Sequence, residues 1–115
     1  MITFENFRKW ALSFPETTAE AHFEKISFRV RKKIFATYDA THRRASMKLS
    51  EVDQSVFCSY DPKVIYPAAN KWGKQGWTLV EMTQIPETLF LDALTTAYCE
   101  VAPKKLAALV RPEEG

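Results

Sequence analysis

Hydrophobic residues repeat at helical spacing near the start of this chain. Phe4, Phe7 and Ala11 recur every three or four residues. This spacing predicts a helix over residues 4–13. Thr3 is suited to cap its first turn, because a threonine side chain can accept a hydrogen bond from a free backbone N–H.

The clearest helical pattern lies between Pro86 and Pro103. Its apolar stripe consists of Leu89, Phe90, Ala93, Leu94, Ala97, Tyr98 and Val101. A stripe that persists over several turns predicts an amphipathic helix over residues 86–102, with Leu94 near the middle of its buried side. A short final helix is expected over residues 104–110.

Between residues 19 and 49 the apolar positions alternate with polar ones, as in strands that bury one face. The alternation predicts strands near residues 19–24, 27–31, 34–38 and 45–49, and a further strand near 77–82. The apolar side of the first four strands is expected to contain Ala21, Phe23, Phe28, Val30, Ile34, Ala36, Tyr38, Met47 and Leu49. Turns are expected at residues 31–33 and 40–44.

A second helix is predicted over residues 51–60, after Ser50 as N-cap. Val52, Val56 and Tyr60 are spaced to form its buried stripe. Residues 63–76 follow neither period, so an irregular loop is expected there. A loop of that length inside a compact domain is often functional.

The predicted order of elements is α-ββββ-α-β-α, without the βαβ repeats that build parallel sheets. It indicates an α+β fold in which an antiparallel sheet of about five strands carries helices on one face. The length of 115 residues suits a single domain over residues 1–115.

Composition narrows the class of protein. No apolar run approaches the roughly 20 residues that cross a bilayer, and the first residues lack the basic and apolar regions of a secretory signal. Cys58 and Cys99 do not form a disulfide framework. A cytoplasmic protein without membrane association is therefore expected.

Charge is distributed unevenly along the chain. Residues 25–48 contain eight basic residues and one acid, Asp39, and therefore carry a charge of +7. The whole chain has a net charge of +2, so the remaining residues carry −5. Such asymmetry is a physical hint about partners and not about the fold.

Three segments together resemble a known family. They are Ser27-Phe28-Arg29-Val30 with Lys33-Ile34-Phe35-Ala36 and Ser46-Met47-Lys48-Leu49, then residues 70–77 (Asn-Lys-Trp-Gly-Lys-Gln-Gly-Trp), then residues 97–105 (Ala-Tyr-Cys-Glu-Val-Ala-Pro-Lys-Lys). In this order they are similar to the strand block, the loop before the last strand and the closing helix of the MmcQ/YjbR-like family. The resemblance spans essentially the whole chain.

The resemblance implies a small, bacterial, cytoplasmic α+β protein. The family is described as DNA-binding-like because of a proposed double-wing arrangement of its hairpins, and no enzymatic activity is established for it as a class.

The basic strand block is the first candidate site. If Phe28 and Val30 face the helices, period-2 alternation places Arg29, Arg31 and Lys48 on the opposite, open face. Basic side chains there and at the two turns would neutralise phosphates without reading bases. The competing interpretation is that hairpin tips are simply solvated and that charges protect sheet edges.

The segment around Trp72 is the second candidate. Lys63, Lys71 and Lys74 occur among aromatic residues, with no acid between Pro62 and Val80. Basic groups beside aromatic rings suit single strands or flipped bases. Alternatively the tryptophans fill the core, which is the favoured interpretation for Trp77 and an equal one for Trp72.

Catalytic and cofactor sites find little support in the sequence. Gly73-Lys74 lacks the other residues of a phosphate-binding loop. His22 and His42 have no partner at metal-ligand spacing. Cysteines in helices are most often inert.

We therefore expect a non-enzymatic nucleic-acid-binding domain without cofactor or metal, contacting DNA phosphates with its basic hairpins and sheet face. The alternative is a protein- or peptide-binding module that uses the open sheet face or the Trp72 loop. The candidate nucleic-acid contacts are Arg29, Arg31, Lys32, Lys33, Arg43, Arg44, Lys48, Lys71, Trp72 and Lys74.

Overall fold

The computed structural model describes residues 1–111. Its elements are α1 (Phe4–Ser13), β1 (Thr17–His22), β2 (Lys25–Val30), β3 (Lys33–Asp39), β4 (Arg44–Lys48), α2 (Glu51–Cys58), β5 (Ile65–Pro67), α3 (Asn70–Lys74), β6 (Trp77–Glu81), α4 (Glu87–Val101) and α5 (Lys104–Val110). The predicted α+β class, helices and main strands are confirmed. The segment expected to be an irregular loop instead contains β5 and α3.

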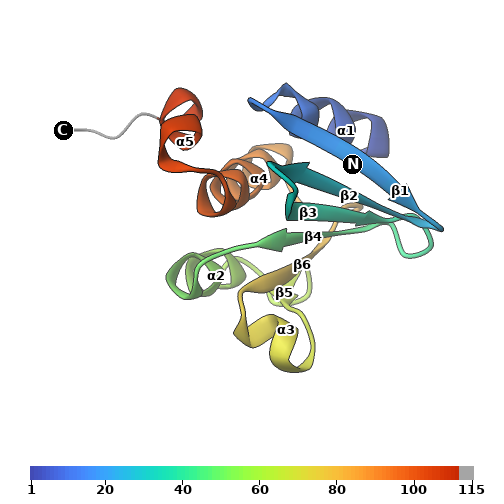
Figure 1. The fold of residues 1–115 in the computed structure, drawn as a ribbon. Coiled ribbons are helices and arrows are strands. Elements are labelled where there is room, and N and C mark those ends of the chain that lie inside the picture. The colour runs from blue at the N-terminus through green and yellow to red at the C-terminus, as the bar shows by residue number, and fades with distance from the viewer. Residues whose placement is uncertain (112–115) are drawn as a thin grey trace.

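One open, antiparallel sheet organises the fold, with strand order β1-β2-β3-β4-β6-β5 (Figure 1). The first four strands form a meander, and β6 then pairs with β4 after the chain has passed through α2, β5 and α3. The helix α1 packs against β1, and α4 packs against β3 and β4 on the same face of the sheet. The helix α3 contacts β5 and β6 at the far end of the strand order (Figure 1). We call the face under α1 and α4 the covered face and the opposite one the open face.

The core fills the space between the covered face and the helices. Phe28, Ala36 and Met47 sit opposite one another on neighbouring strands and are completely buried. Phe7 of α1 packs against Phe28 of β2 and against Phe90 of α4, with ring centroids 4.9 and 5.1 Å away, respectively. The predicted stripe of α4 is confirmed as buried, most completely at Phe90, Ala93, Leu94, Ala97 and Tyr98.

A β-bulge in β3 interrupts the predicted alternation of buried and open side chains. Phe28 pairs with Ala36, yet Arg29 pairs with Ile34, so Phe35 is an extra residue on β3. A bulge lets two successive residues of one strand oppose one residue of its partner. Phe35 and Ala36 are therefore both buried, and Ile34, expected on the covered face, lies on the open one.

The predicted buried stripe of α2 is wrong. Val52, Val56 and Tyr60 are 72, 63 and 54% exposed, whereas Phe57 is 8% exposed and joins the core. The start of α2 is as expected, with the Ser50 hydroxyl accepting a hydrogen bond from the Asp53 N–H at 3.0 Å. This short helix packs on β5, and the side that carries the valines faces away from the sheet.

The end of the β1–β2 hairpin also departs from the predicted pattern. Ala21 and Phe23, expected on the apolar side, are exposed, and Phe23 is exposed to 94% in the turn. Figure 1 shows this hairpin end extending beyond the helices, so no element covers it. Within residues 1–111, no helix has the length and apolar character needed to cross a membrane.

Candidate nucleic-acid interface

The open face follows from the strand register. Ser27, Thr37, Ser46 and Leu79 lie opposite one another in a row across β2, β3, β4 and β6. They alternate with the buried residues of the same strands, so their side chains point away from the core. All are half-buried, which leaves them accessible to a ligand.

A hollow of about 500 Å³ lies over three members of this row, Thr37, Ser46 and Leu79. Its lining consists of Lys25, Ile34, Thr37, Ser46, Ala68, Ala69, Asn70, Trp72, Trp77 and Leu79. The floor is thus formed by the strands and one side by α3 and the segment before it. A concave, mostly apolar site with a few polar groups is the usual form of a ligand site.

Close backbone packing places α3 beside the hollow. A Cβ atom at Gly73 would overlap the Ala68 carbonyl oxygen, so only glycine allows this approach. The side-chain amide of Gln54 on α2 then donates to the Gly73 carbonyl at 3.0 Å and to the Trp77 carbonyl at 3.2 Å. These contacts join α2, α3 and β6 into one support for the wall of the hollow.

Three of the predicted basic contacts are paired with carboxylates. Arg29 lies 3.2 Å from Glu20, and Arg44 lies 2.9 Å from Glu81. The Arg31 guanidinium makes two hydrogen bonds to Glu16, which raises the pKa of Arg31 above its usual value.

All three acids lie outside residues 25–48. Folding therefore reduces the charge excess that the sequence places in that segment.

Glu81 also binds a tyrosine. The Tyr66 hydroxyl donates to the Glu81 carboxylate at 2.5 Å, on the oxygen that Arg44 contacts. Burial, reinforced by the bond to Glu81, raises the pKa of Tyr66 above its usual value, so its hydroxyl keeps its proton. The three side chains form one hydrogen-bonded cluster on β4, β5 and β6, and Arg44 lines a neighbouring cleft that shares Thr37, Ser46 and Leu79 with the hollow.

The lysines keep more freedom than the arginines. Among the described residues, none of Lys32, Lys33, Lys48, Lys71 and Lys74 forms an ion pair. Lys48 donates to the Gln75 carbonyl, and the Lys71 ammonium lies 5.4 Å from the centre of the Trp72 ring.

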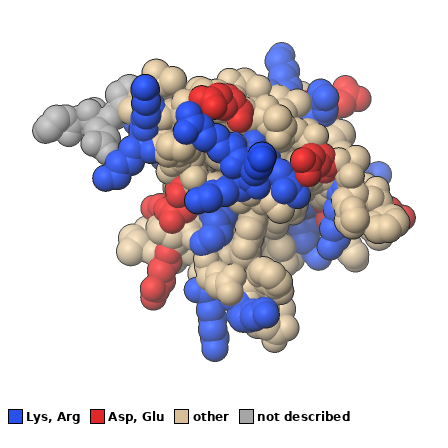
Figure 2. Space-filling view, viewed as in Figure 1, with Lys and Arg blue, Asp and Glu red and all other residues tan. Residues whose placement is uncertain are grey.

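Lys25 is the basic residue among those that line the hollow. Two pairs of lysines lie next in the sequence to other lining residues. Lys32 and Lys33 directly precede Ile34, and Lys71 and Lys74 flank Trp72. We call these pairs the turn rim and the α3 rim. Figure 2 shows basic side chains gathered around the β2–β3 turn in the middle of the view and again over α3 at the bottom, with uncharged surface between them.

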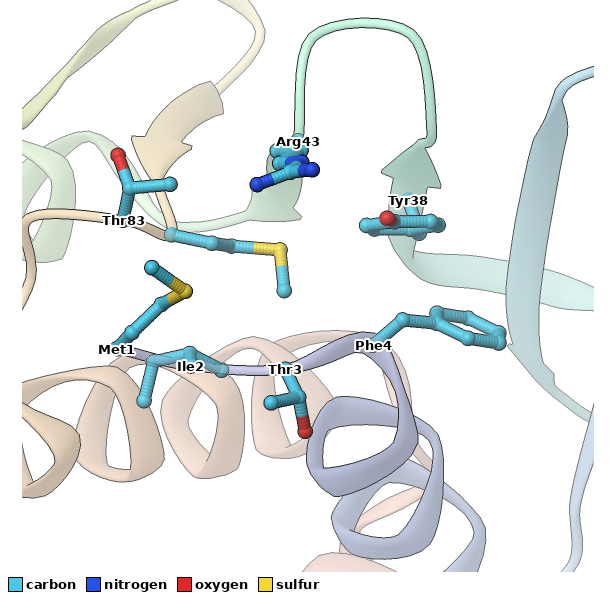
Figure 3. Close-up of a pocket in the computed structure, with 8 residues that line it drawn as sticks. Met1, Ile2, Thr3, Phe4, Tyr38, Arg43 and Thr83 are labelled. Carbon is cyan, nitrogen blue, oxygen red and sulfur yellow. The ribbon is translucent and has the colours of Figure 1, made fainter.

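Arg43 is not part of this face. It lines a separate cleft of about 190 Å³ near the N-terminal segment, together with Ile2, Phe4 and Tyr38 (Figure 3). Figure 3 shows Arg43 above the cleft at the β3–β4 hairpin, on the side of α1. The neighbouring residues Arg43 and Arg44 therefore lie on different surfaces of the protein.

The prediction for Trp77 is wrong, and the two equal interpretations of Trp72 are decided in favour of exposure. Trp77, predicted to fill the core, is half-buried and lines the open hollow, because it lies opposite Lys48 on the open side of β6. Trp72 is 53% exposed. Sequence reasoning missed Ile34, which the bulge moves, and Leu79, whose alternation with buried Val80 could have revealed it.

Cys58 and Cys99 are half-buried thiols, and His42 is bound to a carboxylate. Burial raises the pKa of both the Cys58 and the Cys99 thiols, which disfavours the thiolate. His42 is bonded to Asp39 at 2.9 Å; burial opposes ionisation of Asp39, but the bonds from His42 and Thr41 lower its pKa overall. Within the described part of the chain, no three His, Cys, Asp or Glu residues are grouped as metal ligands.

Comparison with known proteins agrees with this fold. Residues 12–100 match the model of the YjbR family. The chain belongs to the YjbR family. The matched range includes every strand of the sheet, most of α4 and every residue that lines the open hollow, so the YjbR match covers the candidate site itself.

A solved structure adds independent support for the YjbR fold. The crystal structure of a Deinococcus radiodurans protein with a DUF419 domain superposes with a TM-score of 0.79 at 21% sequence identity. The match covers 96% of this chain and 88% of that one. No curated protein matches the sequence.

Proposed function

We propose that this protein is a non-enzymatic nucleic-acid-binding domain that uses the open face of its sheet. The observation that carries the proposal is an open hollow whose lining includes Lys25, Trp72 and Trp77. Next in the sequence to residues of that lining are the turn rim and the α3 rim, whose lysines form no ion pair within residues 1–111. Basic groups that track a backbone and aromatic rings that stack on bases are the two features of proteins that bind single-stranded nucleic acids without sequence preference, and basic groups alone suffice for duplex phosphates.

The contacts in this proposal differ from the ten that the sequence suggests. Lys32, Lys33, Lys71 and Lys74 supply phosphate contacts, with Lys48 between them. Arg29, Arg31 and Arg44 already have carboxylate partners and contribute less, because binding a phosphate would require them to leave those partners. Arg43 at its hairpin is a peripheral contact.

The absence of catalysis and a cytoplasmic location are parts of the same proposal. The raised thiol pKa values of Cys58 and Cys99 support the first, because a thiolate is the reactive form of cysteine. Activity in a panel of hydrolase assays that is lost on changing either cysteine to serine would contradict it.

A protein or peptide partner is the second candidate. The observation that favours it is the apolar lining of the hollow by Ile34, Leu79 and the two tryptophans, which would also accept an apolar side chain. The two candidates differ in their dependence on salt, because counterion release makes nucleic-acid affinity fall steeply with salt.

The test is a titration of fluorescently labelled DNA at low and physiological salt, with double variants at each rim. Lys71→Gln/Lys74→Gln and Lys32→Gln/Lys33→Gln should each flatten the slope of log K against log salt. The change should be up to about 1.8 if both lysines contact duplex phosphates, at about 0.9 per contact.

Lys104→Gln/Lys105→Gln is the matched control. It removes the same charge from exposed positions on α5, on the other side of the molecule from α3 (Figure 1). An equal effect of the control and the rim variants would assign binding to net charge alone. No binding of wild type at low salt would contradict the proposal and favour a protein partner.

A further inference from the structure

We propose that the open-face hollow holds an unstacked base, so that the nucleic acid recognised is single-stranded rather than duplex. This inference rests on the proposed function, and it names the class of ligand for the same face. It depends on the shape and lining of the hollow, and its failure would leave phosphate binding by the lysines in place.

Two tryptophans form part of the lining of the hollow. Trp72 is 53% exposed even though it lies against the hollow, and Trp77 is half-buried beside it. Lys71 lies over the Trp72 ring, which adds a positive charge next to the stacking surface. A base stacked on such a ring contributes about 5- to 150-fold in affinity, and any base provides the flat face required.

The floor of the hollow provides a polar contact for the base. The Thr37 and Ser46 hydroxyls are hydrogen-bonded to each other, and both line the hollow. Each hydroxyl carries one hydrogen, and the bond between them uses only one. The other hydrogen remains free to donate to a ring nitrogen or a carbonyl oxygen of a base.

A paired base would not fit these groups. In a duplex, each base is stacked on both faces and its pairing edge is occupied, so only groove edges are accessible. Ile34 and Leu79 flank the hydroxyl pair at the floor, which a base can reach only after it has left the stack. The turn rim adjoins Ile34 on β3 and the α3 rim adjoins Trp72 on α3, so we expect a single strand that lies over the hollow to bring its phosphates near both.

The experiment compares three probes of equal length: an oligo-dT strand, a duplex and an abasic strand that keeps the phosphates but lacks bases. Wild type should bind oligo-dT about 5- to 150-fold more tightly than the abasic strand. Binding of oligo-dT should quench tryptophan fluorescence, because a base stacked on Trp72 or Trp77 contacts the fluorophore.

The decisive variant is Trp72→Leu, which keeps an apolar side chain and removes the ring. It should weaken oligo-dT binding by about 5- to 150-fold and leave duplex and abasic binding unchanged. The slope of log K against log salt should stay the same. Phe23→Leu is the control, because it removes an exposed aromatic ring from the β1–β2 turn, outside the hollow. Unfolding curves confirm that both variants fold.

Each outcome separates the two proposals. Equal binding of oligo-dT and the abasic strand, or an unchanged oligo-dT affinity in Trp72→Leu, would contradict the proposal that a base occupies the hollow. Either result would leave the proposed phosphate binding intact. Failure of wild type to bind any probe at low salt would overturn the proposed function and this inference with it. Displacement of oligo-dT by an oligo-glutamate of equal charge, as efficient as by unlabelled oligo-dT, would show that the hollow does not select bases.

Discussion

Phe28, Met47 and Val80 lie on the covered face of the sheet and are completely buried. Their neighbours along the same strands, Ser27, Ser46 and Leu79, point to the open face and remain half-buried. Two successive residues of one strand thus meet different surroundings. The covered face uses its side chains to bury apolar surface, and the open face keeps hydroxyls, tryptophans and charged groups accessible.

This difference implies a division of roles. Removing atoms from the covered face leaves a cavity that the tightly packed core cannot close. Removing atoms from the open face exposes little new surface, because solvent already reaches it. We therefore expect stability to depend mainly on the first face and ligand binding on the second.

The largest expected effect tests this division directly. Leu94→Ala should lower the free energy of unfolding by about 2–5 kcal/mol, because Leu94 is completely buried in α4 against the sheet. Leu79→Ala makes the same chemical change on the open face and should cost less than about 2 kcal/mol. Urea unfolding followed by circular dichroism measures both changes. Equal losses of unfolding free energy in the two variants would contradict the expectation that stability depends mainly on the covered face.

A smaller effect concerns the charged border of the open face. A double-mutant cycle with Arg44→Met and Glu81→Gln should give a coupling of about 1 kcal/mol, near the upper end for partly exposed pairs. The side chains of this pair are 30 and 16% exposed. The Arg31–Glu16 pair, at 55 and 52%, is the control and should show no measurable coupling. A stronger coupling between Arg31 and Glu16 than between Arg44 and Glu81 would mean that side-chain exposure does not determine the strength of these ion pairs.

The smallest effect is expected on α2, where the sequence and the structure disagree. Val56→Ala should change the free energy of unfolding by no more than about 0.5 kcal/mol, because Val56 is 63% exposed. Phe57→Ala, one residue away, should cost about 3–5 kcal/mol. A loss at Val56 comparable to that at Phe57 would restore the predicted buried stripe.

The same contrast explains what the sequence could predict. The α4 stripe was predictable because a long helix with one apolar side has only one way to bury it against a sheet. The shorter α2 stripe has the same spacing, but spacing does not say which element covers it, and none covers Val52 and Val56. The bulge at Phe35 shifts one residue in β3, and a pattern of period 2 contains no signal for such a shift.

The candidate site was predictable in its residue types and not in its arrangement. Lysines around Trp72 were visible in the sequence. The pairing of Arg44 with Glu81 joins residues 37 positions apart, and only the β4–β6 register brings them together. The separation of Arg43 from Arg44 is likewise a consequence of the turn, because one residue lies in the hairpin loop and the next begins β4.

The late return of the chain to the sheet has a consequence for folding kinetics. The strands of the β1–β4 meander pair with sequence neighbours, whereas β6 joins β4 only after the intervening residues 49–76 have closed a loop. Loop closure carries an entropic cost that grows with length, so we expect the meander to form before β6 docks. The walls contributed by α3 and β6 then assemble last. Transient release of that late unit would open the hollow while the meander persists, and a bound ligand would slow amide hydrogen exchange in β6 more than in β2.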